Sequence, residues 1–322
     1  MAFEDGLGTD PSQQRGENFA GSAYDLTSRT VNLWFSKLVH YIIIVGIIGA
    51  ACVVVSYVLL LSLFGTVGTI GADPLSYIVN LFFTSIADFN LIAVTLIFAV
   101  FAFVLNAIIQ GAAIKFTLDE YGGPGGDIGT SFSHSFGRIV NFLIVQLILS
   151  FLVAIVLAPA TSLAFQAIEL MDLENITDPY NFTFPPGSIE MLMAAMGFFL
   201  IGGLFLIYFN VRFAPTLAIV IDTDLSAIDS LKKAWELTSG NFLHVFGSII
   251  LVNVVVVIIG MGLGFVMAFI PLTTDLLSVI QAVIIALLFT PLSFIFTAVL
   301  YRDLSSRAGL STVSSSLDDL RV

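Results

Sequence analysis

Charged residues and cysteine are scarce in this 322-residue sequence, and each shortage excludes a class of protein. Only 11% of the residues are charged and 58% are hydrophobic, whereas soluble domains carry roughly 25% charged residues. The composition therefore indicates an integral membrane protein. The single cysteine, Cys52, excludes a disulfide framework within the chain and a cysteine-based zinc site. The three histidines, His40, His134 and His244, are scattered, so we expect no metal site and no cofactor.

Cations are the scarcer sign of charge. The sequence has 11 Lys and Arg residues against 23 Asp and Glu residues, which gives a formal net charge of −12. Nucleic-acid binding needs clustered cations, so this charge argues against a nucleic-acid partner. A strongly acidic balance also resembles the surface composition of proteins from a high-salt cytoplasm, where hydrated carboxylates keep surfaces soluble. We therefore predict a halophilic archaeal source.

Six apolar stretches, each free of Asp, Glu, Lys and Arg, are long enough to cross a bilayer, which takes about 20 residues. They predict an all-α integral membrane protein whose six transmembrane helices lie near residues 39–64, 91–114, 139–158, 191–211, 242–270 and 276–301. The membrane domain would cover residues 23–303, between a mobile N-terminus (residues 1–22) and a mobile tail (residues 304–322). No short apolar run follows basic residues near the start, so we expect no cleavable signal peptide.

The distribution of cations predicts the orientation of these helices. With six spans, one side of the membrane holds both termini and the even loops. That side carries all 11 cations: Arg15, Arg29, Lys37, Lys115, Arg138, Arg212, Lys232, Lys233, Arg302, Arg307 and Arg321. By the positive-inside rule, both termini are cytoplasmic in a multi-pass protein of the plasma membrane. The longest outer loop, near residues 159–190, contains two N-x-[ST] sequons, which make Asn175 and Asn181 candidate N-glycosylation sites in a glycosylating cell.

Short amphipathic helices are predicted on the cytoplasmic side. Between residues 222 and 240, four apolar residues fall on one helical stripe: Leu225, Ile228, Leu231 and Trp235. The stripe either lies in the headgroup plane, with Lys232 and Lys233 reaching for lipid phosphate, or packs on the bundle. Trp34, which like Trp235 is a candidate for the membrane interface, precedes the first span in a related pattern, 201 residues before Trp235 (235 minus 34). This spacing indicates three repeats of an amphipathic helix and two spans.

Five amides lie within the predicted spans: Asn106, Gln110, Gln146, Asn253 and Gln281. We expect them to bond between helices, and the alternative is that they line a polar pocket. Arg212 is predicted to snorkel at the interface, with a buried functional position as the alternative. Gly260 and Gly264 form a GxxxG packing face, which is more typical of contact within one chain than of a dimer seam.

The last third of the chain resembles a known family. The resemblance rests on four segments: Tyr208-Phe-Asn-Val-Arg212-Phe-Ala-Pro215, Asp222-Thr-Asp224, Ala227-Ile-Asp-Ser-Leu-Lys-Lys-Ala-Trp235-Glu-Leu-Thr-Ser-Gly-Asn241 and Tyr301-Arg-Asp-Leu304. They are similar to segments of an uncharacterised family of polytopic membrane proteins that includes the membrane module fused to some glycerophosphodiester phosphodiesterases. The phosphodiesterase itself is a separate soluble barrel for which this chain has no room, so the resemblance implies no catalytic residue.

No cluster of nucleophile, acid, base or metal ligand is evident, so we expect a protein that is not an enzyme. The favoured interpretation is an envelope, assembly or membrane-organising factor whose partners are the lipid bilayer and other membrane proteins. The alternative is a permease for a small neutral or lipid-like solute. A polar cavity lined by Asn106, Gln146 and Asn253 would favour transport, and a dry bundle would favour the first interpretation.

Overall fold

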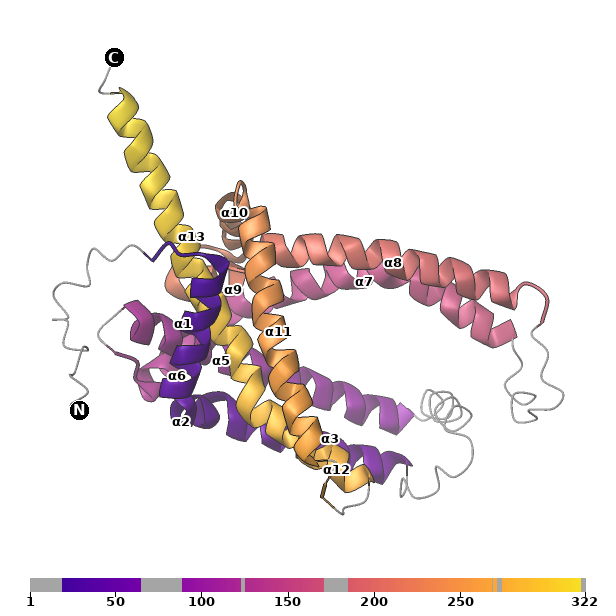
Figure 1. The fold of residues 1–322 in the computed structure, drawn as a ribbon. Coiled ribbons are helices and arrows are strands. Elements are labelled where there is room, and N and C mark those ends of the chain that lie inside the picture. Colours follow the sequence, from indigo (N-terminus) through magenta and orange to yellow (C-terminus); the bar gives the residue numbers. More distant parts are fainter. Residues whose placement is uncertain are drawn as a thin grey trace.

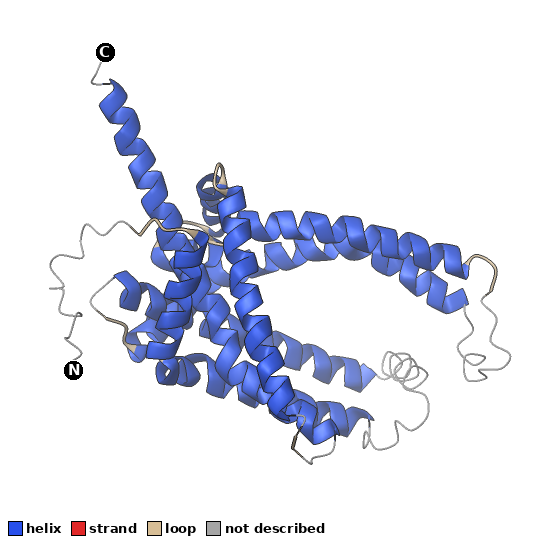
Figure 2. Ribbon diagram, in the orientation of Figure 1, coloured by secondary structure: helices blue, strands red, loops and turns tan. Residues whose placement is uncertain are grey.

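The computed structural model describes residues 19–64, 89–122, 125–170, 185–267, 269–270 and 274–319. All regular structure within these ranges is helical, and six of the helical segments are long and apolar enough to cross a membrane (Figures 1 and 2). The prediction of an all-α membrane protein with six spans is therefore confirmed.

Three successive parts of the chain repeat one order, a short amphipathic helix followed by two long helical segments. The first unit consists of α1 (Ala23–Ser36), a span made of α2 (Leu38–Tyr41), η2 (Ile42–Gly46) and α3 (Ile47–Phe64), and then α5 (Phe89–Gly122). The second consists of α6 (Ile128–Gly137), α7 (Ile139–Leu170), α8 (Ser188–Phe213) and the short α9 (Thr216–Asp222). The third consists of α10 (Ala227–Thr238), α11 (Phe242–Met267) and a span made of α12 (Thr274–Ile284), η4 (Ile285–Phe289) and α13 (Thr290–Asp319).

The three short helices begin with the same chemistry. Ser22 and Ser226 are N-caps whose hydroxyls accept the backbone N–H of Asp25 and Asp229, each at 3.2 Å. Asp127 caps α6 by accepting the backbone N–H three residues further on, at 2.8 Å. Each cap satisfies a backbone donor that the first turn leaves unpaired, so it fixes where the amphipathic helix starts.

Each unit is also closed by one pair of polar side chains at the same place. In each case a cationic or histidine side chain at the start of the unit's first span meets an acid near the end of its second span. The pairs are Lys37 with Glu120 at 2.7 Å, Arg138 with Asp224, and His244 with Asp303 at 2.9 Å. This equivalence supports the predicted threefold repeat, and it gathers the charges at one end of the bundle. We call that end, with α1, α6 and α10, the polar end.

The hydrophobic core lies at the polar end. It is built from the last turns of α5, from α9, and from α13 near Leu292 and Leu300, all fully or nearly fully buried. Of the second unit's long helices, the buried members of this core are Phe142 and Val145 of α7 and Val211 of α8. The rest of the α7–α8 hairpin extends away from the other spans (Figure 1). Within the hairpin the two helices pack closely, because a Cβ atom added to Gly202 would lie 3.3 Å from Val156.

Two π-helical segments face each other where span one meets span six. Gly46 at the end of η2 lies so close to η4 that a Cβ atom there would stand 3.1 Å from the Cα atom of Leu287. Pro291 is the second residue after η4, and its ring removes one backbone donor. The indole N–H of Trp34 donates to the carbonyl of Leu288 at 2.8 Å, so a carbonyl in this irregular turn is satisfied from α1.

Three helices run further than the sequence predicts. α7 continues through Pro159 to Leu170, beyond the predicted end at residue 158, and the Thr161 hydroxyl bonds back to the carbonyl of Leu157 at 3.1 Å. A proline inside a membrane helix is tolerated when such groups satisfy the backbone around it. α5 extends to Gly122, and α13 extends to Asp319, where a mobile tail is predicted. The ion pair between Asp303 and Arg307, one turn apart in α13, supports that continuation.

Candidate functional site

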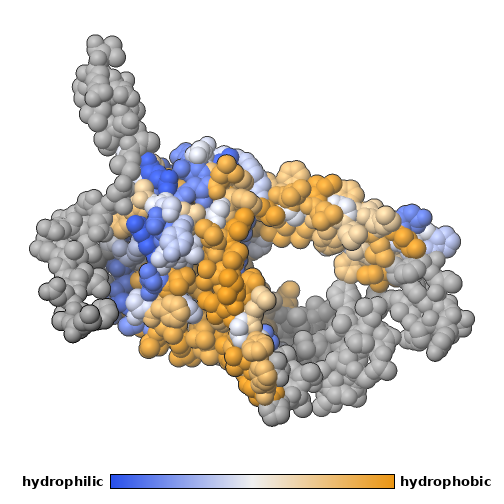
Figure 3. All heavy atoms as spheres, in the orientation of Figure 1, coloured by the Kyte–Doolittle hydropathy of each residue, from blue (hydrophilic) through white to orange (hydrophobic). Residues whose placement is uncertain are grey.

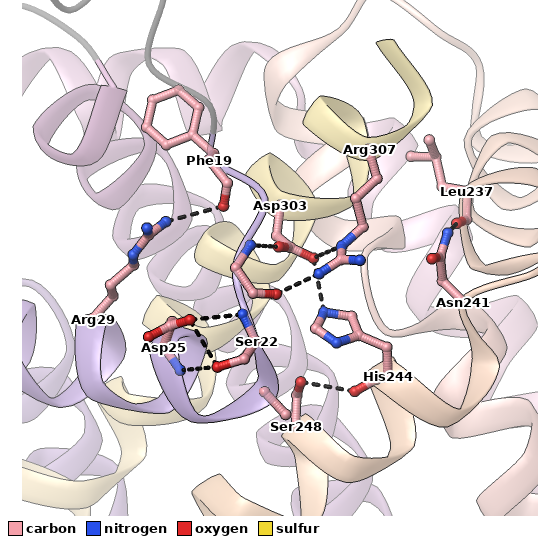
Figure 4. A network of polar contacts seen from close by, with 12 residues as sticks. Phe19, Ser22, Asp25, Arg29, Leu237, Asn241, His244, Ser248, Asp303 and Arg307 are labelled. Atoms are coloured by element: carbon pink, nitrogen blue, oxygen red, sulfur yellow. Dashed lines mark hydrogen bonds and ion pairs between the residues drawn. The ribbon is translucent and has the colours of Figure 1, made fainter. Parts of the chain in front are cut away.

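The polar end holds a buried carboxylate, Asp303, with 1% of its surface exposed. It accepts the backbone N–H of Gly21 at 2.8 Å and Nε of Arg307 at 2.9 Å, and Nε2 of His244 lies 2.9 Å from it (Figure 4). Arg307 also donates to the carbonyl oxygen of Gly21. One carboxylate therefore joins α11, α13 and the segment that precedes α1. His244 supplies the contact from α11.

Further contacts hold the same segment. Arg29 donates to the carbonyl of Phe19 at 3.0 Å and to the hydroxyl of Tyr121 at 2.7 Å. Tyr301 donates to Asp222 at 2.9 Å, which ties α13 to α9. These acids, bases and hydroxyls lie outside the two cavities described below. Their geometry is that of a structural network. Asp303 is part of the Tyr301-Arg-Asp-Leu304 motif, but the sequence does not single it out as the centre of this network.

Arg212 is half-buried among aromatic rings. Its guanidinium carbon lies 4.7 Å from the ring centre of Trp235, 5.3 Å from that of Tyr208 and 5.7 Å from that of Phe242. Nε also donates to the Tyr208 hydroxyl at 3.2 Å. The apolar segment runs past Arg212 to Asp222, so the residue lies within it, and cation–π contacts at the junction of α8, α10 and α11 hold it there.

The other predicted interface residues divide between surface and core. α10 packs through small residues such as Ala227, Ser230 and Ala234, so Trp235 of the predicted stripe stays 38% exposed at its edge. Lys232 and Lys233 are exposed and pair with acids of their own helix, Asp229 at 3.4 Å and Glu236 at 3.7 Å. Trp34, predicted at the interface, lies inside the protein with 4% of its surface exposed. A buried indole needs a partner for its N–H, and the carbonyl of Leu288 supplies it.

The five predicted amides do not converge on one site. Gln146 on α7 donates to Gln110 on α5 at 3.0 Å, a contact between helices of the predicted kind. Asn253 lines a cavity, as the alternative interpretation requires. Asn106 on α5 and Gln281 on α12 line neither of the two cavities described below, and neither cavity is the pocket predicted around Asn106, Gln146 and Asn253.

Two adjoining cavities lie between the α7–α8 hairpin and the rest of the protein. The first, of about 690 Å³, is a groove between α8 and α11, and the second, of about 670 Å³, is bounded by α7, α8, α11 and η4–α13. They share four lining residues: Leu206, Asn210, Ile249 and Asn253. The lining of both is apolar apart from Asn210, Asn253, Ser293 and Thr297. Figure 3 shows hydrophobic side chains along α11 and the hairpin on either side of an opening.

Asn210 is the functional candidate that the sequence analysis missed. It lies two residues before Arg212, at the predicted end of a span, and its exposed amide faces both cavities. Its position inside the Tyr208 to Pro215 motif is the signal that could have found it.

The GxxxG face of α11 is open. A Cβ atom added to Gly260, Gly262 or Gly264 would meet no atom of the described residues within 4 Å. No described residue therefore packs against this face, and the contact within the chain that the sequence favours is not seen in the described ranges. Asn175 and Asn181 lie outside the described residues. Among the residues that are described, no group of three His, Cys, Asp or Glu could hold a metal ion.

Comparison with known families places these cavities in one domain. A family model described as a domain of unknown function, DUF7847, matches residues 128–304, more than half of the 322-residue chain. The chain belongs to the DUF7847 family. The DUF7847 domain begins at α6 and ends within α13, so it includes every residue that lines the two cavities, whereas α1 to α5 precede it. No curated protein and no solved structure matches the chain.

Proposed function

We propose that this is a non-enzymatic membrane protein that binds a lipid-like solute in the two adjoining cavities and acts as a permease for it. The observation that carries the proposal is the apolar groove between α8 and α11. Because the described residues that line it come from two helices only, it opens sideways toward the surrounding lipid, and an amphiphile can enter it without leaving an apolar medium. The cavities lie wholly inside the DUF7847 domain, the part of the chain that defines the family.

The arrangement of the α7–α8 hairpin supports movement of such a solute. The buried core residues of the hairpin, Phe142, Val145 and Val211, all lie in its half nearer the polar end. Its far half can therefore change its distance from α11 while Phe142, Val145 and Val211 stay packed, which would open or close the groove. A polar solute is less well supported, because Asn106 and Gln146 do not reach the cavities.

We also propose the membrane in which the protein lies and the kind of organism from which it comes. The polar end carries the cations of the described residues, so by the positive-inside rule it faces the cytoplasm of the plasma membrane with both termini. The acidic composition supports a halophilic archaeal source. We further propose that the protein is related to a wider family, which includes the membrane module fused to some glycerophosphodiester phosphodiesterases. This part of the proposal rests on the motifs from Tyr208 to Leu304.

Native purification tests the proposal. Protein extracted from its own membrane should retain a lipid-like molecule near one per chain, measured by native mass spectrometry. Ile249→Trp places an indole in the wall shared by both cavities and should remove that molecule. Leu243→Trp is the matched control, since Leu243 lies on α11, is highly exposed and lines neither cavity. Equal lipid content in the two variants, or none in the wild type, would reject the proposal.

A membrane-organising role is the second candidate, and the open Gly260–Gly264 face favours it. Small residues allow a second helix to approach closely in lipid. After Cys52→Ser, a single cysteine at Gly260 should form a disulfide with another copy or a partner in native membranes. A cysteine at the exposed Leu200 of the hairpin is the control. Failure of Gly260→Cys to cross-link above this control would remove the second candidate.

A further inference from the structure

Two amides face the cavities with their hydrogen-bonding groups largely unused. Asn210 has no side-chain hydrogen bond to any described residue, and it is exposed. Asn253 donates to the carbonyl of Ile249 in its own helix at 2.8 Å, which leaves its Oδ1 and one N–H unpaired among the described residues. An unpaired amide is costly in hydrocarbon, because it gives up hydrogen bonds to water without replacement. These two side chains therefore point to a polar group on whatever occupies the cavities.

The other polar groups in the lining are already bonded within their own helix. The Ser293 hydroxyl donates to the carbonyl of Thr290 at 2.8 Å, and the Thr297 hydroxyl donates to the carbonyl of Ser293 at 2.9 Å. Among the lining residues of both cavities there is no Asp, Glu, Lys, Arg or His. The free side-chain donors in these cavities are thus amide N–H groups, and no counter-ion is present for a charged head.

The depth of Asn253 strengthens the charge argument. Asn253 lies 11 residues after Phe242, the first residue of α11 (253 minus 242). At about 1.5 Å per residue this is about 16 Å from the polar end of the helix, close to the middle of a hydrocarbon layer of about 30 Å. A carboxylate or phosphate held there without a cation would carry the full cost of leaving water. The polar group that meets Asn253 must be uncharged.

We propose that the cavities select a neutral amphiphile, a long hydrocarbon chain that ends in one hydroxyl or carbonyl group. Its head lies between Asn210 and Asn253, where the amides donate to its oxygen and an amide oxygen accepts the hydroxyl proton. Its chain follows the groove past Val257 and Ile258. Phospholipids and fatty acids are rejected because they bring a charge. This inference rests on the proposed function and names the class of its solute.

Photolabelling with a matched series of probes tests the inference. Four diazirine-bearing probes share one hydrocarbon chain and differ in the head: a primary alcohol, a methyl ketone, a carboxylate and a plain methyl group. Labelled peptides are identified by mass spectrometry in the full-length protein reconstituted in lipid. The double variant Asn210→Leu/Asn253→Leu removes both amides, and Asn106→Leu is the control, an amide in a span that lines neither cavity. Size-exclusion profiles and helix content check that each variant is folded.

We expect the alcohol and ketone probes to label α8 and α11 peptides in the wild type and in Asn106→Leu. In the double variant, labelling by these two probes should fall about tenfold, the loss expected for one or two hydrogen bonds, while labelling by the methyl probe stays unchanged. Asn253→Gln, which keeps an amide, should restore part of the selectivity when Asn210 is intact. Equal cavity labelling by the carboxylate and alcohol probes, unaffected by the double variant, would overturn the inference and leave the proposed function standing. Absence of cavity labelling by every probe would overturn both.

Discussion

The last turns of α5 and the far half of α7 are both long apolar helix, yet their surroundings differ completely. Ala112, Ile114 and Phe116 of α5 are fully buried, whereas Phe151 and Ile155 of α7 are 68% and 57% exposed. The first group lies at the polar end, among helices of all three units. The second lies on a hairpin whose far half packs chiefly on its own partner helix.

This difference shows which region of the protein depends on specific side-chain contacts. Lipid tails are as apolar as leucine, so exposed apolar residues cost nothing in the bilayer, and hydropathy alone cannot distinguish the two regions. What fixes the polar end is close packing together with paired charges and caps. Substitutions there should therefore be far more damaging than matched substitutions along the hairpin or the open face of α11.

The largest effect is expected at Asp303. Asp303→Ala leaves His244 and Arg307 without their shared acceptor and releases the backbone N–H of Gly21, so we expect a loss of about 3 kcal/mol in stability. Thermal unfolding in detergent, followed by tryptophan fluorescence, measures it. Glu190→Ala, at the exposed start of α8 in the hairpin, is the matched control and should cost less than about 1 kcal/mol. Similar losses in the two variants would contradict the contrast between the regions.

Gly46 gives a smaller but sharper test. A methyl group there would stand 3.0 Å from the carbonyl oxygen of Leu287 and 3.1 Å from its Cα atom, so Gly46→Ala must push spans one and six apart. We expect a cost of roughly 1 to 3 kcal/mol. Gly260→Ala, on the open face, should leave stability unchanged or raise it by less than about 1 kcal/mol, because alanine favours a helix. The same unfolding assay decides, and a destabilised Gly260→Ala would mean that its face is covered.

The smallest effect concerns the N-cap of α10. The Ser226 hydroxyl donates to the carboxylate of Asp229, and this bond, helped by Lys232, lowers the pKa of Asp229 below its ordinary value of 3.8. A lowered pKa in the folded state means that the contribution is complete at neutral pH and is lost as the pH falls through the folded value, below about pH 4. Hydrogen exchange, corrected for intrinsic rates, should show protection falling in the first turn of α10. Ser226→Ala should flatten this pH dependence, and an unchanged profile would count against the cap.

The number and placement of spans could be read from the sequence because lipid imposes one rule on every spanning segment. An 18-residue apolar stretch must satisfy its backbone internally, and a helix does so. The ends of the helices were harder to predict from the sequence. Pro159 reads as a stop in water, but in lipid the Thr161 hydroxyl bonds back to the helix and α7 continues. Similarly, the polar composition after Leu304 concealed a helix that the Asp303–Arg307 pair supports.

The candidate site was less predictable than the fold. Asn253 could be named as a pocket residue, but Gln146 pairs with Gln110 instead, because which amides meet depends on helix rotation that hydropathy does not specify. Asn210 was overlooked since its neighbour Arg212 suggested the membrane surface. The burial of Trp34 was hidden for a related reason. An indole at the start of a span is typical of the interface, and here the carbonyl of Leu288 provides the partner that an interior indole needs.

The facing π segments η2 and η4 couple the rotation of span one to that of span six. Each π turn holds one residue more than a regular turn, so it advances the phase of everything beyond it by about 100°. Since η2 and η4 lie side by side, the far halves of spans one and six are turned at the same depth. Loss of one residue from η2 alone would rotate the far half of span one against an unchanged span six. The two insertions thus act as a matched pair, and a change in the length of one span is tolerable only with a change in the other.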